Sequence, residues 1–119
     1  MLKFAILTVL ALAATPALAG PADVLKVEAR AAGGGWSFDV TVAHADTGWD
    51  HYADAWRVVG PDGTVYGTRT LFHPHVGEQP FTRSLSGVVI PEGVQAVTVE
   101  AHDLVHGWGG ATVEVMLPQ

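Results

Sequence analysis

The strongest constraint on the fold is a strict alternation of apolar and polar residues in short runs. The clearest run, residues 36–43, places apolar side chains at every second position: Trp36, Phe38, Val40 and Val42. Successive side chains of an extended strand point to opposite faces, so this pattern predicts a strand with one buried face. After residue 20 no segment has a convincing helical period, and the sequence therefore predicts an all-β chain.

Glycine, proline and aspartate separate the runs at intervals typical of antiparallel β-proteins. The predicted strands are residues 25–30, 36–43, 55–59, 64–72, 81–89, 95–103 and 111–117. Seven short strands with this spacing predict an immunoglobulin-like or fibronectin-like antiparallel sandwich, with Trp56 as its core tryptophan. A small barrel is the alternative.

Two runs carry more specific expectations. In the first, Leu25, Val27 and Ala29 are expected to share the buried face. In the fifth, Arg83 falls on the same face as the apolar residues on either side of it, which predicts either a bulge or a carboxylate partner for Arg83.

Residues 1–19 predict a cleaved secretory signal peptide. Lys3 precedes the apolar residues 4–14, and Ala17-Leu18-Ala19 provides the small-x-small cleavage pattern before Gly20. The apolar core is shorter than the roughly 18 residues needed to span a membrane. We therefore expect one domain, residues 20–119, located in the periplasm or secreted.

The composition of the chain excludes several classes of partner and of site. The chain has 12 Asp and Glu against 6 Lys and Arg, a formal net charge of −6. Such a surface repels nucleic-acid phosphates and anionic lipids, so neither nucleic acid nor, after signal cleavage, a membrane is expected as a partner. There is no cysteine, which excludes disulfides, a lipid-modified cysteine and a blue-copper site within these residues.

All six histidines are expected at one pole of the sandwich. If successive strands are antiparallel, the second, fourth and sixth strands end where the third, fifth and seventh begin. The histidines lie at these ends: His44, His51, His73, His75, His102 and His106. Carboxylates and tryptophans expected near them, as ligands, outer-sphere partners or stacking groups, are Asp46, Asp50, Asp54, Glu78, Asp103, Trp49 and Trp108.

Imidazole clusters favour a transition-metal site. His73-Pro74-His75 is the sharpest local signal, because residues two apart in an extended segment project to the same side. The expected ligands are this pair with His51 or His44, and with His102 or His106 in addition. Cu(II) or Zn(II) is the expected cofactor, and no organic cofactor is indicated. His102 is the weaker candidate, since its parity places it on the outer face of its strand.

A second interpretation is an immunoglobulin-like interaction module, in which the aromatic and acidic pole binds a periplasmic protein or a sugar without metal. Neither interpretation requires catalysis. No nucleophile elbow or Ser-His-Asp arrangement can be identified from the spacing, so we do not expect an enzyme.

The run 46–54, followed by His73-Pro74-His75 and residues 78–83, resembles a group of small exported bacterial β-sandwich proteins with no assigned function. The resemblance covers most of residues 20–119. It implies export and a β-sandwich, and it implies no activity or ligand set.

Overall fold

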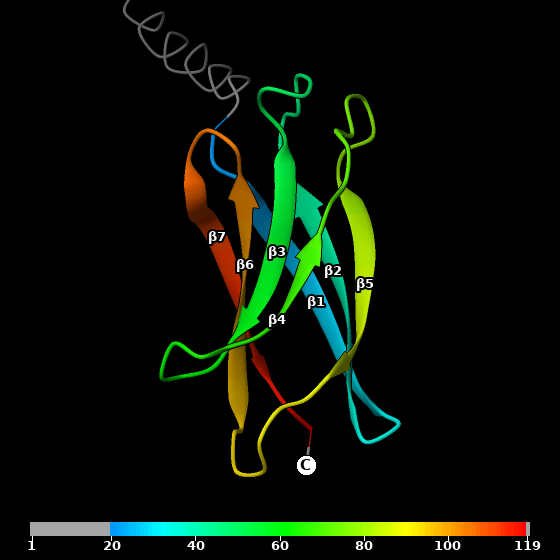
Figure 1. Ribbon diagram of the computed structural model, residues 1–119, viewed down its shortest axis with the longest axis vertical. Coiled ribbons are helices and arrows are strands. Elements are labelled where there is room, and N and C mark those ends of the chain that lie inside the picture. Colours follow the sequence, from blue (N-terminus) through cyan, green and yellow to red (C-terminus); the bar gives the residue numbers. More distant parts are fainter. Residues whose placement is uncertain (1–19, 119) are drawn as a thin grey trace, which may run out of the picture.

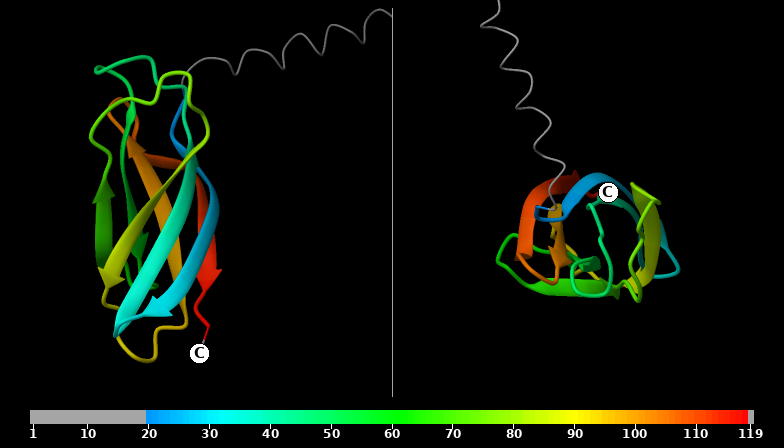
Figure 2. Two further views of the ribbon diagram at one scale, coloured as in Figure 1. Left: turned by 90° about the vertical axis from the view of Figure 1, so that its right-hand side faces the viewer. Right: turned by 90° about the horizontal axis from the view of Figure 1, so that it is seen from above.

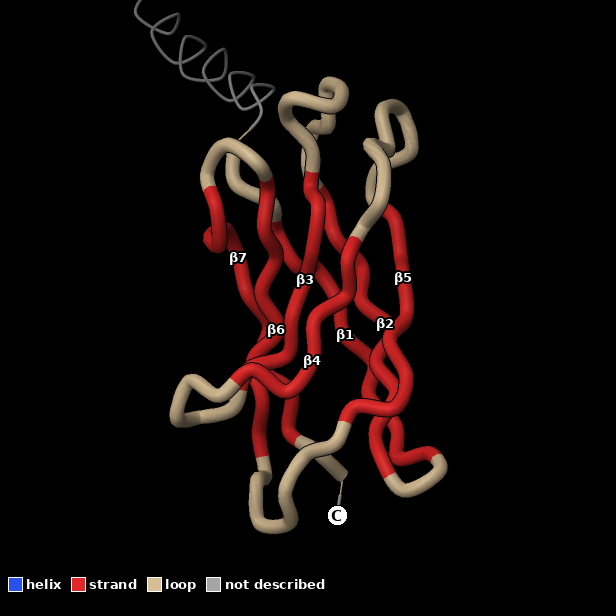
Figure 3. Tube along the Cα trace, in the orientation of Figure 1, coloured by secondary structure: helices blue, strands red, loops and turns tan. Residues whose placement is uncertain are grey.

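The computed structural model describes residues 20–118, and the predicted signal peptide lies outside them. Seven strands account for most of the described chain (Figures 1 and 3). They are β1 (Asp23–Ala32), β2 (Gly35–Ala43), β3 (Ala53–Val59), β4 (Val65–Thr70), β5 (Phe81–Val88), β6 (Ala96–Asp103) and β7 (Gly107–Met116). The predicted all-β chain of seven strands is confirmed, with strand ends displaced by up to a few residues.

The strands form two antiparallel sheets, ordered β1-β2-β5 and β4-β3-β6-β7. The sheets face each other across one core, as the end-on view in Figure 2 shows. They share no strand, so the alternative of a single closed barrel is wrong.

Alternating side chains from both sheets build the core. Phe38 from β2 and Trp56 from β3 are completely buried between the sheets, and Val97 and Val99 of β6 are buried beside them. Burying a side chain of this size contributes on the order of 2–3 kcal/mol. The prediction of Trp56 as the core tryptophan is confirmed.

The first strand departs from simple alternation. The register between β1 and β2 shifts between Val24 and Lys26, so that Leu25 falls on the bulge. Leu25 is therefore 52% exposed, and Val24 is buried instead. The prediction that Leu25 shares the buried face with Val27 is wrong, because one extra residue reverses the direction of the side chains before it.

The prediction for Arg83 is also wrong in both of its forms. The register of β5 with β2 is regular at Arg83. Its partner is an imidazole instead of a carboxylate, because Nη2 lies 2.8 Å from Nε2 of His75.

Three of the loops meet at one end of the molecule, which we call the upper pole: residues 44–52, 71–80 and 104–106 (Figure 1). The described chain also starts there, at Gly20. Five of the six histidines lie in these loops, and the sixth, His102, is the second-last residue of β6. The upper pole is therefore where functional geometry has to be sought. The described residues contain no helix of the length and apolarity that a membrane span requires.

A close backbone approach at Gly110 fixes the start of the domain against β7. Gly110 has φ +70°, and a Cβ there would overlap the carbonyl oxygen of Ala22. The amide of Ala111 donates to Oδ1 of Asp23 at 2.7 Å. We expect Gly110→Ala to lower the free energy of unfolding by at least about 2 kcal/mol, from positive-φ strain and displacement of Ala22.

The matched control for this variant is Gly109→Ala. A Cβ at Gly109 would meet only Pro21, at an ordinary 3.8 Å. Urea unfolding of both variants checks the prediction, and equal stabilities would contradict it.

Candidate metal centre

The ends of β2 and β6 and the loop between β2 and β3 carry the densest group of ionisable side chains. His44 lies two residues after the inward-facing Val42, and Asp103 continues the inward face of Val97, Val99 and Ala101. Parity therefore directs both side chains into the top of the core, where each is completely inaccessible to solvent. His51 reaches the same place from the loop, with 16% of its side chain exposed.

His44 and Asp46 form a buried pair that fixes the orientation of the imidazole. Nδ1 of His44 lies 2.5 Å from Oδ1 of Asp46. Asp46 also accepts the amides of Ala53 at 3.0 Å and His75 at 2.8 Å. A carboxylate so held accepts a hydrogen bond from Nδ1–H of His44, which leaves the lone pair of the imidazole on Nε2. This is the arrangement that supports metal-bound histidines.

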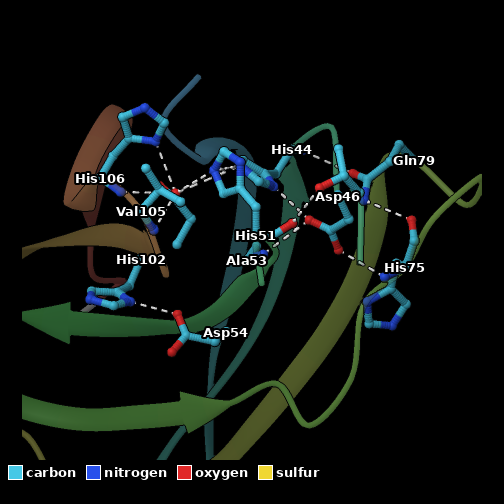
Figure 4. Close-up of polar contacts among 12 residues, drawn as sticks. His44, Asp46, His51, Ala53, Asp54, His75, Gln79, His102, Val105 and His106 are labelled. Atoms are coloured by element: carbon cyan, nitrogen blue, oxygen red, sulfur yellow. Dashed lines mark hydrogen bonds and ion pairs between the residues drawn. The ribbon is translucent and has the colours of Figure 1, made fainter. Parts of the chain in front are cut away.

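Nε2 of His44 lies close to a second imidazole, that of His51 (Figure 4), and to a carboxylate, that of Asp103. It lies 3.2 Å from Nε2 of His51 and 3.8 Å from Oδ2 of Asp103. Nε2 of His51 is 2.8 Å from the same Asp103 oxygen. Three atoms that are able to bind a metal thus surround one point, and these three residues form a group that could hold a metal ion.

The loop conformation that delivers His51 comes from a tight turn. The amide of His51 donates to the carbonyl of Gly48 at 3.2 Å, and the amide of Thr47 donates to the carbonyl of His51 at 3.0 Å. Gly48 has φ +153°, which favours glycine at this position. The turn projects Trp49 outward and brings His51 back over the core.

Asp103 is a buried carboxylate to which several groups of the protein donate hydrogen bonds. Its Oδ2 accepts the amides of Val105 at 3.1 Å and His106 at 3.0 Å, and it contacts Nδ1 of His106 at 2.9 Å. Burial raises its pKa, but the hydrogen bonds from His106, His51 and Val105 outweigh burial and lower the pKa to about 2. Asp103 is therefore an anion at any physiological pH. Oδ1 is buried and has no partner among the described residues.

The lowered pKa of Asp103 predicts a pH-dependent stability of the metal-free protein. A carboxyl whose pKa is lower in the folded than in the unfolded state stabilises the fold above the unfolded value, near 3.9. About 2 kcal/mol is expected to be lost as the pH falls from about 4 to about 2. Urea unfolding at pH 5 and pH 2 measures this loss. It should be smaller in Asp103→Asn, and an equal loss in both proteins would contradict the assignment.

His106 stands beside the three-residue group. Its Nδ1 contacts Asp103, its ring centroid is 5.2 Å from that of His51, and 35% of its side chain is exposed. It is followed by Gly107 at φ +77°. His106 therefore lies on the solvent side of the three-residue group, as a hydrogen-bond partner of Asp103 and outside the group itself.

The structure places His73 and His75 outside this group. Their rings are adjacent, with centroids 4.9 Å apart, as expected from their spacing. However, the His75 ring stacks on Phe81 at 4.1 Å and its Nε2 faces Arg83. His73 is exposed. The pair expected at the centre of the site contacts the centre only through the amide of His75, which donates to Asp46.

His102 lies on the outer face of β6, as its parity predicts. Nδ1 is 2.5 Å from Oδ1 of Asp54, and its ring packs edge-on against Trp108. Arg57 lies over the other part of that tryptophan at 3.8 Å. Figure 4 shows His102 and Asp54 apart from the His44–His51 pair. His102, Asp54 and Trp108 thus form a separate surface contact.

The other expected residues of the pole, Asp50, Glu78 and Trp49, are exposed in the loops. Trp49 belongs to a set of exposed apolar side chains on the same three loops. We call this set the apolar rim: Trp49, Phe72, Val76, Leu104 and Val105, each at least 45% exposed.

The structure places Asp103 within the three-residue group and Asp46 against its His44. From the sequence, both were expected only among the carboxylates near the histidines. For Asp103 the signal was present, because it extends the alternation of Val97, Val99 and Ala101 by one more inward position. For Asp46 no periodic signal exists, since it lies in a loop.

Comparisons with known proteins give one informative relative. A protein of Halomicrobium mukohataei named "Putative lipoprotein" is 43% identical over 95 residues, which are 79% of this chain and 46% of that protein. The chain thus spans less than half the length of this relative. No protein-family model and no solved structure gives a significant match. The resemblance predicted from the sequence is confirmed at this level: the match is described as a lipoprotein and not by an activity.

Proposed function

We propose that the protein is a small exported metal-binding module without enzymatic activity, with His44, His51 and Asp103 as ligands of Zn(II) or Cu(II). The observation that carries the proposal is the triangle of ligand atoms with edges of 2.8, 3.2 and 3.8 Å. Ligands of a tetrahedral ion with bonds of 2.0–2.1 Å stand about 3.3 Å apart. The mean edge agrees with this value, which favours Zn(II).

The proton inventory supports the same conclusion. With the Nδ1 proton of His44 directed to Asp46, its Nε2 carries a lone pair facing Nε2 of His51. Only the His51 nitrogen can supply a proton to this triangle, and Asp103 is its nearer acceptor. A cation accepts the lone pairs of all three atoms once that proton has moved to Nδ1 of His51. Protons compete with the metal for the imidazole nitrogens, so metal binding should weaken as the pH falls.

The surroundings also fit the role. Two buried carboxylates, Asp46 and Asp103, lie at the pole and attract a cation. His106 contacts Asp103 but lies outside the three-residue group, so it would have to move closer to become a fourth ligand, and water would otherwise take that position. With the exported location that the relative's name suggests, the module would buffer, deliver or sense the metal outside the cytoplasm. These 119 residues contain no cysteine for a lipid to be attached to.

We assign the fold to the immunoglobulin-like sandwiches. The orders β1-β2-β5 and β4-β3-β6-β7 match the A-B-E and C-F-G strands of that fold, with β4 added to the second sheet. A solved structure of this chain, superposed on a fibronectin type III domain, would test the assignment.

Thermal melting of the metal-free protein with added Zn(II) or Cu(II) tests the metal proposal. A ligand that binds only the folded state at 100 times its dissociation constant adds about 2.7 kcal/mol. We expect a raised midpoint and a stoichiometry of one ion per chain in dialysis with elemental analysis. An unchanged midpoint with both ions would refute the proposal.

The apolar rim favours a second candidate function, an interaction module that binds a periplasmic protein. Single exposed apolar residues are common on protein surfaces, but five on neighbouring loops are typical of an interaction site. Trp49→Ser with Phe72→Ser should then abolish capture of the partner while leaving metal binding unchanged. Retained capture would exclude the rim as the binding surface.

A further inference from the structure

Two arginines of this acidic protein have no carboxylate partner. Among the five basic residues in the described chain, three form ion pairs: Lys26 with Glu28, Arg30 with Asp39, and Arg57 with Glu100. Neither Arg69 nor Arg83 forms one with any described residue. In a chain with twice as many acidic as basic residues, this is unexpected for two residues that are each only partly exposed.

The two arginines lie on the two edge strands that approach each other, β4 and β5, at matching heights. β4 and β5 are edge strands of different sheets, and they run side by side where a Cβ on Gly67 would come within 3.1 Å of Leu85. Arg69 lies two residues beyond Gly67 toward the upper pole, and Arg83 lies two residues beyond Leu85 in the same direction. Each shares the inward face of its neighbour. The backbones of Arg69 and Arg83 therefore lie about one 6.6 Å repeat above that contact, and both side chains start on the inward face, opposite Trp56 and Val40.

His75 contacts both Arg83 and Phe81 at this end of β5. We call the region the β4–β5 seam and define it by Arg69, His75, Phe81 and Arg83. Arg83 can only donate, so Nε2 of His75 accepts its proton at 2.8 Å. A neutral His75 must then carry its own proton on Nδ1. Burial, Arg83 and His73 lower the pKa of His75 by more than Asp46 and Glu78 raise it, which favours the neutral form.

The seam consequently contains donors without acceptors. Nδ1 of His75 and Nε of Arg69 are both buried, and neither has a partner among residues 20–118. Only 3% of His75 is exposed to solvent. A buried N–H without an acceptor costs about 1–3 kcal/mol. These two donors, with the two guanidinium groups of Arg69 and Arg83 that no carboxylate neutralises, are the complement of a negatively charged acceptor.

We propose that the β4–β5 seam binds a small oxyanion, a carboxylate or a phosphate, held by Arg69 and Arg83. Arginine is suited to this because its planar fork presents parallel N–H groups to two oxygens of one anion. The site is distinct from the metal centre, since the seam groups are donors and the metal ligands are acceptors. Two residues connect the two sites: Asp46 accepts hydrogen bonds from the amide of His75 and from Nδ1 of His44, and Gln79 accepts the amide of His44 and donates to the carbonyl of His75.

Calorimetric titration of the metal-free full chain with inorganic phosphate, and separately with acetate, tests this site. Sodium chloride at matched ionic strength serves as the reference, and chelators are removed beforehand because they are themselves polycarboxylates. We expect saturable binding of one anion per chain. Tighter binding of phosphate indicates a phosphate ligand, and tighter binding of acetate indicates a carboxylate. A response to both that equals the chloride reference overturns the proposal.

Arg69→Gln and Arg83→Gln should each weaken the binding at least tenfold. Arg30→Gln removes the same charge from an existing ion pair on β1 and should leave it within about twofold. An equal loss in all three variants would show a general charge effect and overturn the site. If Arg69→Gln fails to fold, Arg69→Lys keeps the charge but loses the fork, and unchanged binding there also overturns the proposal. His44→Ala should retain anion binding whatever happens to metal.

Discussion

Replacing His44 by alanine is expected to weaken Zn(II) or Cu(II) binding at least about 100-fold, or about 2.7 kcal/mol. Among the three proposed ligands, His44 has the orientation that is most completely fixed, by the 2.5 Å contact with Asp46 and by the full burial of its side chain. Its removal leaves two of the three ligands and opens the top of the core. Competition with a chromogenic chelator measures the affinity at pH 7.

Two histidine variants are matched controls for this loss. His102→Ala removes an imidazole that is bound to Asp54 on the outer face of β6. His73→Ala removes an exposed one. Both should bind metal within about threefold of the wild type. If His73→Ala loses the metal and His44→Ala keeps it, the His-Pro-His segment is the site after all and the triangle is not.

The sequence was sufficient to predict the strands and the pole because both depend on local pattern. The alternation of residues 36–43 and 95–103 decides which side chains face inward, and antiparallel succession decides which loops meet. Thus the gathering of all six histidines at the upper pole, the buried Trp56 and the outward His102 all followed from parity and strand order.

The composition of the site did not follow, because it depends on contacts between segments far apart in sequence. Nothing local to His75 indicates that Phe81 will stack on its ring and that Arg83 will occupy its Nε2. Likewise, the turn from Thr47 to His51 determines that His51 returns to the core. A one-residue bulge at Leu25 has the same origin, since the pairing of two strands sets it and not the pattern of one.

The second large effect is expected from Asp46→Asn, which should lower the free energy of unfolding of the metal-free protein by about 2–3 kcal/mol. Both oxygens of Asp46 are used as acceptors: Oδ1 by His44 and Ala53, and Oδ2 by His75. An asparagine must present an NH₂ group at one of these positions. That group faces an N–H donor in either orientation, so at least one buried donor loses its acceptor.

The same change should weaken metal binding by 10–100-fold, because the carboxylate that orients a ligating histidine is lost while the three ligands remain. Asp54→Asn is the matched control. It also contacts a histidine Nδ1 at 2.5 Å, but both side chains are about one-quarter exposed and distant from the centre. We expect this control to change stability by less than about 1 kcal/mol and affinity not at all. Equal effects of the two substitutions would mean that Asp46 acts only as one more surface partner of histidine, and the buried His44–Asp46 pair would then have no role in orienting a metal ligand.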